Sequence, residues 1–308
     1  MTGRRSFPLA APTWPAGLER PAPNRGIGLD YHHEWSRRYP VRLLRAMVLD
    51  NLTRPAARLV APTTVRGDEH LRHVAGPVIF AANHASHLDT PLLLTTLPPR
   101  FRHHIVVAAA ADYFFDRRWK AVLWSFSLAA IPIERARVDR RSADQAAALL
   151  DDGWSLVIFP EGGRTPDGWS QEFKGGAAYL ARRCSVPVVP VHISGTRAIL
   201  AKGSKRFSPG ETGVRFGKPM WSGDDDARHF SARVEQAVAL LADEAESDWW
   251  SARRRAASGT TPPLRGPEVA AWRRTWELPE SAGGGRREVT GRRDSWPFAR
   301  LSRPTSLD

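Results

Sequence analysis

Apolar positions follow two different spacings along the chain, and the change from one to the other separates predicted strands from predicted helices. Short, nearly continuous apolar runs are typical of strands that are buried on both faces of a sheet. Such runs alternate with helical segments over most of residues 77–217, which predicts an α/β fold. The runs cover residues 77–82, 104–110, 131–135, 155–162, 186–193 and 213–217.

A basic amphipathic helix is predicted for residues 37–58. Apolar residues at helical spacing form one side: Val41, Leu44, Val48 and Leu52. Three arginines form another side: Arg38, Arg42 and Arg45. Pro55 should end the helix, because proline lacks the backbone N–H that a helix interior needs. Two roles stay open: packing of the apolar side on the domain, or attachment of the helix to an anionic membrane surface.

Four more helices are predicted between and after the apolar runs. Ser142 and Gln145 form a capping-box signature ahead of the second one, and Gly153 should stop it. The helical segments cover residues 113–129, 146–153, 175–184 and 225–250. The first is rich in aromatic and basic residues and is a second candidate for membrane contact, with core packing as the alternative.

The two ends of the chain differ in composition from the middle. Residues 1–30 are Pro-rich and aperiodic and are predicted to be disordered. Residues 31–65 form the basic amphipathic helical region, residues 66–250 a domain of catalytic size, and residues 251–308 a polar, disordered tail rich in Arg, Gly and Pro. No run approaches the ~18 apolar residues of a spanning helix, and prolines interrupt the N-terminal stretch. We therefore expect neither a transmembrane segment nor a signal peptide.

The chain is strongly basic, with 45 Lys and Arg against 32 Asp and Glu and a net charge of +13. This excess indicates an anionic partner: a nucleic acid, an anionic membrane surface or a phosphorylated substrate. The sequence has no recognised nucleic-acid-binding motif and no basic stripe with stacking aromatics, so we expect no nucleic-acid partner. The single cysteine, Cys184, excludes an internal disulfide.

The sequence Asn-His-Ala-Ser-His-Leu-Asp at residues 83–89 allows three interpretations. Its polar residues could bind a metal, act as an acid/base pair, or only cap a helix. The spacing of His84, His87 and Asp89 does not match a standard helical zinc pairing, and no later cluster is an obvious source of further ligands. We therefore expect no metal site.

The acid/base interpretation follows from the position of the motif. A strand that ends at Asn83 would place His84 at the carboxyl edge of the sheet, where α/β sites usually form. A helix that begins there brings Asp89 close enough to hydrogen-bond the imidazole, as a general base and its partner require. Ser86 is only two residues from His84, and Cys184 has no base in sight. The pattern favours direct removal of a proton from a substrate hydroxyl that attacks an activated acyl or phosphoryl group.

A glycine-rich turn at the end of the apolar run 155–162 indicates what the substrate carries. Gly162 and Gly163 let the backbone approach an anion closely, and Arg164 can contact phosphate oxygens with both arms of its guanidinium. Lys174 lies at the start of the next predicted helix, where backbone N–H groups also favour anions. Together these residues predict a phosphate pocket.

The two motifs, in this order and spacing, resemble those of the glycerolipid acyltransferases, specifically the lysophosphatidate (1-acylglycerol-3-phosphate) acyltransferase family. The resemblance rests on NHxSxxD, on FPEGxR followed by Ser or Thr, and on the later VPVVPV, and it spans about residues 66–247. It implies that His84 is the general base and Asp89 its partner. It also implies that Glu161, Gly162 and Arg164 contact the phosphate of the acceptor, and it nominates Arg135 as a further contact. Gly163, Thr165 and Lys174 complete the predicted acceptor-binding residues.

Two positions depart from the family pattern. Gly163 stands where the family commonly has Thr or Ser. Arg135 ends the short strand that the family uses as a further block, but the glycine that often precedes that block is absent.

The resemblance also implies a fold and a reaction. The fold would be a mixed sheet flanked by helices. The reaction would move a fatty acyl group from an acyl thioester, acyl-CoA or acyl carrier protein, to the free hydroxyl of lysophosphatidate, with no metal or organic cofactor. The enzyme would act as a peripheral protein on the cytoplasmic face of the cell membrane. Another lysophospholipid or a glycolipid is the closest alternative acceptor, and a catalytically idle membrane-binding module is a further alternative.

Overall fold

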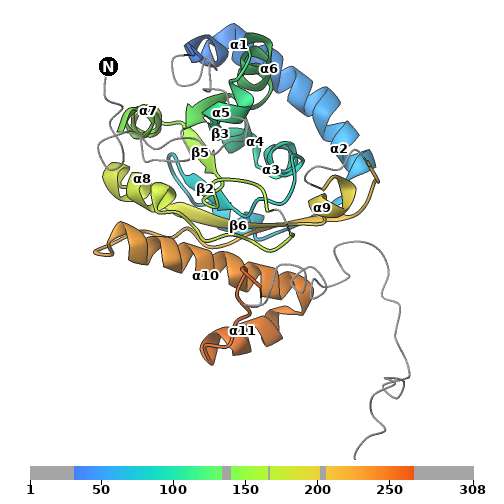
Figure 1. The fold of residues 1–308 in the computed structure, drawn as a ribbon, viewed down its shortest axis with the longest axis vertical. Coiled ribbons are helices and arrows are strands. Elements are labelled where there is room, and N and C mark those ends of the chain that lie inside the picture. Colours follow the sequence, from blue (N-terminus) through green and yellow to red (C-terminus); the bar gives the residue numbers. More distant parts are fainter. Residues whose placement is uncertain (1–30, 134–139, 166, 202–205, 267–308) are drawn as a thin grey trace, which may run out of the picture.

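The computed structural model describes residues 31–133, 140–165, 167–201 and 206–266. In this part of the chain one mixed sheet lies between two layers of helices, so the predicted fold class is confirmed (Figure 1). Residues 1–30 and 267–308, for which the sequence predicts disorder, lie outside the described residues, as does Arg135.

The sheet has seven strands in the order β1-β7-β6-β2-β5-β3-β4. β2 lies at the centre and is parallel to both of its neighbours, β5 and β6. β7 is antiparallel to β6 and parallel to β1, which makes the sheet mixed. The strands are β1 (Thr63–Arg66), β2 (Ile79–Ala82), β3 (Ile105–Ala110), β4 (Ala130–Ile133), β5 (Ser155–Ile158), β6 (Val188–Ser194) and β7 (Thr212–Phe216).

The helices of the described residues cover both faces of this sheet (Figure 1). The α-helices are α1 (Tyr39–Val48), α2 (Arg54–Val60), α3 (Asp89–Thr96), α4 (Pro99–Arg102), α5 (Ala111–Phe114), α6 (Arg118–Leu128), α7 (Arg140–Asp151), α8 (Gly176–Cys184), α9 (Thr196–Ile199), α10 (Ala227–Glu246) and α11 (Trp249–Ala257). Two short 3-10 helices, η2 (Glu34–Arg37) and η4 (Asp68–Leu71), and a π-helical turn, η3 (Leu49–Thr53), complete the described elements.

The central strand shows why the apolar runs predict the sheet well. Successive side chains of a strand point to opposite faces. Ile79 and Ala81 pack in the core formed with α7, α8 and α10, whereas Phe80 and Ala82 pack in the core formed with α3. A strand buried on both faces needs apolar residues at every position. β1 was missed because its residues alternate between half-buried and exposed positions at the edge of the sheet.

The N-terminal helix extends beyond Pro55, which the sequence predicts as its end. α1, η3 and α2 follow one another without a break up to Val60. In the π turn the Arg54 N–H donates to the carbonyl of Leu49, five residues earlier. This wider turn precedes Pro55 and changes the carbonyl positions against which its ring would clash, so the helix continues.

One interpretation of the sequence was that the apolar side of this helix packs on the domain. The structure shows the opposite orientation. Arg42 lies 3.0 Å from His104 Nδ1 and 4.9 Å above the Trp154 ring, and Arg45 is buried and donates to the Ser36 carbonyl. Large apolar side chains point outward instead: Tyr39, Leu43, Leu44, Met47, Leu52 and Leu59 are exposed. Arg42 and Arg45 therefore face the domain, whereas Arg38 is exposed, and the large exposed side chains of the helix are apolar.

Two other predicted helices are corrected. α7 already includes Arg140, so Ser142 lies buried inside the helix and does not cap it. Gln145 contacts His33 instead of forming a capping box. Gly153 has φ +84° and ends the helix as expected. The predicted 113–129 helix is interrupted after α5 by the fully buried Phe115.

The long C-terminal helix is two helices. α10 ends at Glu246, and Asp248 caps α11 by accepting a hydrogen bond from the Ser251 N–H. The predicted start of the polar tail at residue 251 therefore falls inside a helix. None of the described helices has both the length and the apolar character needed to cross a bilayer.

Arg42→Ala should lower the free energy of unfolding by about 1–2 kcal/mol, because it removes a hydrogen bond and a cation–π contact on the inward side of α1. The matched variant Arg38→Ala changes an exposed arginine one turn earlier and should have an effect within about 0.5 kcal/mol. Denaturant unfolding of both variants measures this difference. Equal losses of stability would contradict the inward orientation of Arg42.

Candidate active site

The His84 turn begins where the central strand ends. Asn83 fixes the turn to β6 through two hydrogen bonds: its Nδ2 donates to the Ile193 carbonyl at 2.9 Å, and its Oδ1 accepts from the Ile193 N–H at 2.7 Å. A buried side-chain amide that pairs with a backbone in both directions leaves little freedom to the next residue. His84 is thereby held at the carboxyl edge of the sheet, where the sequence predicts it.

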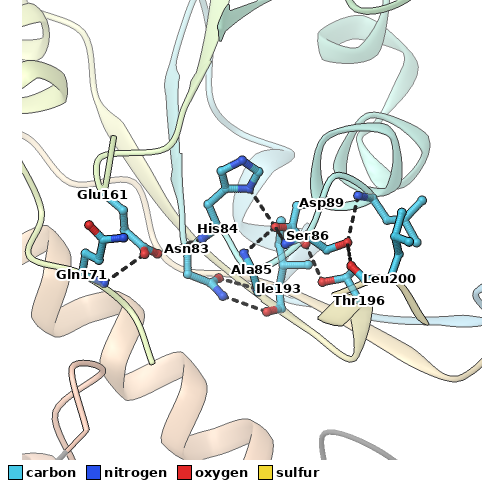
Figure 2. Close-up of polar contacts among 11 residues, drawn as sticks. Asn83, His84, Ala85, Ser86, Asp89, Glu161, Gln171, Ile193, Thr196 and Leu200 are labelled. Carbon is cyan, nitrogen blue, oxygen red and sulfur yellow. Dashed lines mark hydrogen bonds and ion pairs between the residues drawn. The ribbon is translucent and has the colours of Figure 1, made fainter. Parts of the chain in front are cut away.

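Asp89 is fully buried at the first position of α3 and holds the imidazole (Figure 2). Its Oδ2 lies 2.9 Å from His84 Nδ1 and also accepts the backbone N–H groups of Ala85 at 2.7 Å and Ser86 at 2.8 Å. Its Oδ1 accepts the hydroxyl of Thr196, from α9. A carboxylate held in this way keeps the proton of neutral His84 on Nδ1 and leaves Nε2 to accept a proton.

The loop at residues 159–165, which carries the FPEGGRT motif, also contacts His84. The ring of His84 stacks on Phe159, with centroids 4.1 Å apart and planes at 23°. The His84 N–H donates to Glu161 Oε1 at 2.8 Å, and the His84 carbonyl accepts from the Thr165 N–H at 2.9 Å. The two sequence motifs therefore meet at one residue.

Glu161 has a different environment from the one that the resemblance implies. It is buried, its Oε1 is bound to the His84 N–H, and its Oε2 accepts the Gln171 N–H at 2.9 Å. Burial raises the pKa of Glu161 to about 7, although the two backbone hydrogen bonds act in the opposite direction. Its contacts position the His84 turn, and a carboxylate is poorly suited to contact a phosphate.

The remaining residues of the motif form a cationic surface beside this loop. Gly162 has φ +74°, a backbone conformation that favours glycine, and a Cβ at this position would lie 2.7 Å from Lys174 Nζ, so the ammonium lies close to this backbone. The Arg164 guanidinium lies 5.8 Å from the centre of the Tyr113 ring. Gly162, Gly163, Arg164 and Lys174 line the same cavity as His84. Thr165 is buried and contributes its backbone N–H to His84.

This cavity has a volume of about 1320 Å³ and a mixed lining. Arg164 and Lys174 form its cationic part, and the lining also includes His84 and the acidic residues Glu161, Glu172 and Glu235. Its apolar lining comes from β3, β4, α6 and α7 and includes Val107, Ala108, Trp124, Leu128, Ile133 and Ala146. A polar head and a long apolar chain can therefore be bound by one continuous site.

His87 shares the motif with His84 but not its environment. Its Nε2 lies 3.2 Å from the Tyr113 hydroxyl, and the two rings stack. Burial and the nearby Arg164 lower the pKa of His87 to about 4, so it is neutral at physiological pH. Within the described part of the chain, no three His, Cys, Asp or Glu side chains form a group that could hold a metal ion.

The sequence did not reveal several residues that build the site. These residues are Thr196 at the start of α9, Phe159 just after β5, Tyr113 in α5 and Gln171 in a loop. Phe159 lies in the FPEGGRT motif and Gln171 lies just after it, so the motif was only a weak signal for these two residues. Thr196 and Tyr113 gave no local signal.

Comparisons with known proteins identify similar acyltransferases. The family model described as Acyltransferase matches residues 62–194. A 1-acyl-sn-glycerol-3-phosphate acyltransferase from Cocos nucifera is 27% identical over 192 residues, which cover 59% of this chain and 57% of the relative. The alpha form from Homo sapiens is 29% identical over 190 residues, which cover 60% of this chain and 65% of the relative. The chain spans between about half and two thirds of the length of the curated relatives that it matches.

A solved structure has the same fold. The crystal structure of the 1-acyl-sn-glycerophosphate (LPA) acyltransferase PlsC from Thermotoga maritima matches with a TM-score of 0.53 and 25% identity, over 69% of this chain and 83% of that chain. Fold, site and sequence together define an acyltransferase domain. Residues 62–194 match the acyltransferase family model, and this part of the chain is similar to 1-acyl-sn-glycerol-3-phosphate acyltransferases.

Glu161→Gln should change how stability depends on pH. Because burial raises the pKa of Glu161 to about 7 from its ordinary value of 4.5, the folded state keeps a proton that the unfolded chain loses between these values. Ionisation of Glu161 therefore costs stability as the pH rises through this window, and the variant lacks that loss. Denaturant unfolding of both proteins at about pH 5 and about pH 7.5 measures the difference.

The comparison with the variant isolates Glu161 from other titrating groups. Burial lowers the pKa of His33, His87 and His192 to about 4, but these histidines titrate in both proteins. An identical pH dependence of the two proteins would show that Glu161 is ionised throughout.

Proposed function

We propose that this protein transfers a fatty acyl group from an acyl thioester to the free hydroxyl of lysophosphatidate and so makes phosphatidate. One observation carries the proposal: His84, which is paired with the buried Asp89, lines a cavity whose walls combine the cations Arg164 and Lys174 with many apolar side chains. A lysolipid and an acyl thioester each combine an anionic head with an apolar chain. The names of the relatives, which are 1-acyl-sn-glycerol-3-phosphate acyltransferases, support the choice of acceptor.

In the proposed reaction His84 acts as a general base on the acceptor. Its Nε2 takes the hydroxyl proton while that oxygen attacks the thioester carbonyl carbon, which forms a tetrahedral intermediate. Asp89 stabilises the imidazolium through the Nδ1 contact at 2.9 Å. The intermediate collapses with cleavage of the C–S bond, and the imidazolium returns its proton to the departing thiolate. No metal or organic cofactor takes part in these steps.

The acceptor phosphate would be bound by the cationic part of the cavity. Arg164 offers a bidentate contact and Lys174 a point charge close to the Gly162 backbone. Gly163 lines the cavity in the same loop. Arg135 and a direct contact from Thr165 stay predictions from the sequence. The apolar part of the cavity would take an acyl chain, and the donor would be acyl-CoA or an acylated carrier protein.

Membrane attachment would use the outward apolar side of the N-terminal helices. α1 contacts α6, and both lie on the side of the sheet opposite α11 (Figure 1). Exposed apolar residues continue from α1 onto α6, where they are Trp119, Val122 and Leu123. The exposed arginines Arg38, Arg117 and Arg118 lie on these same segments and would attract anionic lipid. The protein would then be peripheral, on the cytoplasmic face of the membrane.

His84→Ala and Asp89→Asn should each lower the rate of acyl transfer by about 10²–10⁴-fold, the usual cost of losing a general base or its partner. The matched control is His87→Ala, because His87 lines the same cavity but does not contact Asp89. Initial rates with labelled acyl-CoA and lysophosphatidate, on variants shown to be folded, measure this. A loss in His87→Ala as large as that in His84→Ala would exclude the proposed roles.

Changing Leu43, Leu44 and Met47 together to Ser should weaken binding to vesicles by about tenfold or more, because each side chain is about half exposed and would enter the interface. The control is a double change of Trp249 and Trp250, which are also exposed but lie on α11, on the opposite side of the molecule. Sedimentation with vesicles rich in anionic lipid compares the two. If the α11 variant bound less well than the α1 variant, the proposed membrane face would be wrong.

A further inference from the structure

The loop that supports His84 is itself held by residues far along the chain. Gln171 binds Glu161 through its backbone N–H, and burial and this contact set the position of the Glu161 carboxylate. Gln171 is the middle residue of the segment 169–173. Each of the other four residues of this segment contacts α10 or residues 264–266. These partners lie after residue 194, where the match to the acyltransferase family model ends.

Residues 264–266 hold the first half of this loop. The Ser170 N–H donates to the Leu264 carbonyl at 3.1 Å, and the Ser170 side chain is also hydrogen-bonded to Glu161. Gly266 has φ +69°, and a Cβ at this position would lie 2.3 Å from the ring of Trp169. The backbone of Gly266 therefore packs directly on the indole, in a way that no other residue permits.

The Glu235 side chain holds the second half of the loop and ties it to the same residues. Its Oε2 accepts the Phe173 N–H at 3.1 Å. Its two oxygens also accept from Arg265, Nε at 2.8 Å and Nη2 at 3.1 Å. Arg265 lies 3.8 Å from Glu172 as well, so one guanidinium connects α10 to the loop.

We propose that Glu235 and residues 264–266 form a clasp that positions the Glu161 loop and, through it, both His84 and the phosphate-binding residues. The path is short: the clasp holds residues 169–173, Gln171 and Ser170 hold Glu161, and Glu161 holds the His84 N–H. Gly162, Gly163 and Arg164 follow Glu161 in the same loop. Glu235 and Arg265 are positioning residues, and their effect on kinetics rests on the proposed function.

Arg265→Ala tests the clasp, and Arg255→Ala is the matched control. Arg255 makes the same kind of bidentate contact with Asp243, at 2.7 and 2.6 Å, two turns further along α10 and away from the loop. Hydrogen exchange of the free protein should become about threefold or more faster at the amides of His84 and Gln171 in Arg265→Ala only. Arg265→Lys, which keeps one ion pair with Glu235, should restore part of the protection. Unchanged exchange at both amides in folded Arg265→Ala would overturn the clasp.

Steady-state kinetics provide a second measurement, the KM for lysophosphatidate, which a loss of stability alone does not change. Arg265→Ala should raise the KM for lysophosphatidate by about threefold or more and leave the KM for acyl-CoA unchanged, whereas a smaller folded fraction lowers only the apparent kcat. Equal changes in both KM values would count against the clasp. If the unchanged protein transfers no acyl group to any acceptor, the proposed function fails, while the exchange experiment still decides whether the clasp exists.

Discussion

The buried carboxylate of Asp89 is the interaction on which the site depends. It accepts hydrogen bonds from the His84 ring, from two backbone N–H groups of the turn and from Thr196. A carboxylate without exposure needs this many partners, because a buried, unpaired charge is costly. The same bonds that satisfy Asp89 therefore fix the turn, the rotation of the imidazole and the approach of α9. In the proposed mechanism, catalysis and local stability would depend on the same set of contacts.

The sequence predicts the local part of this site and misses the rest. His84 and Asp89 lie five residues apart in the turn between a strand and a helix, so their contact follows from the spacing. Thr196 is 107 residues from Asp89 in sequence and meets it only because β6 lies beside β2. The resemblance identified Glu161 but assigned it to the phosphate, whereas its backbone contacts depend on a loop conformation that no motif specifies.

The fold was predicted where burial is complete and mispredicted where it is partial. Apolar runs identified the strands that are buried on both faces, but β1 and the direction of β7 carry no such signal. On α1 the helical period showed that two sides exist without showing which one faces the domain. Arg42 could turn inward because the Trp154 ring and His104 offer its guanidinium suitable partners. These partners come from distant segments, so the sequence period alone did not reveal that the apolar side faces outward.

The central claim is that the cationic part of the cavity selects a phosphorylated acceptor for acyl transfer at His84. The most direct measurement incubates the purified protein with labelled acyl-CoA and three acceptors of equal chain length: lysophosphatidate, lysophosphatidylcholine and monoacylglycerol. We expect labelled phosphatidate as the main product, formed at least about tenfold faster than the other two, because only lysophosphatidate offers a terminal phosphate to Arg164 and Lys174. Equal or faster acylation of monoacylglycerol would contradict the claim.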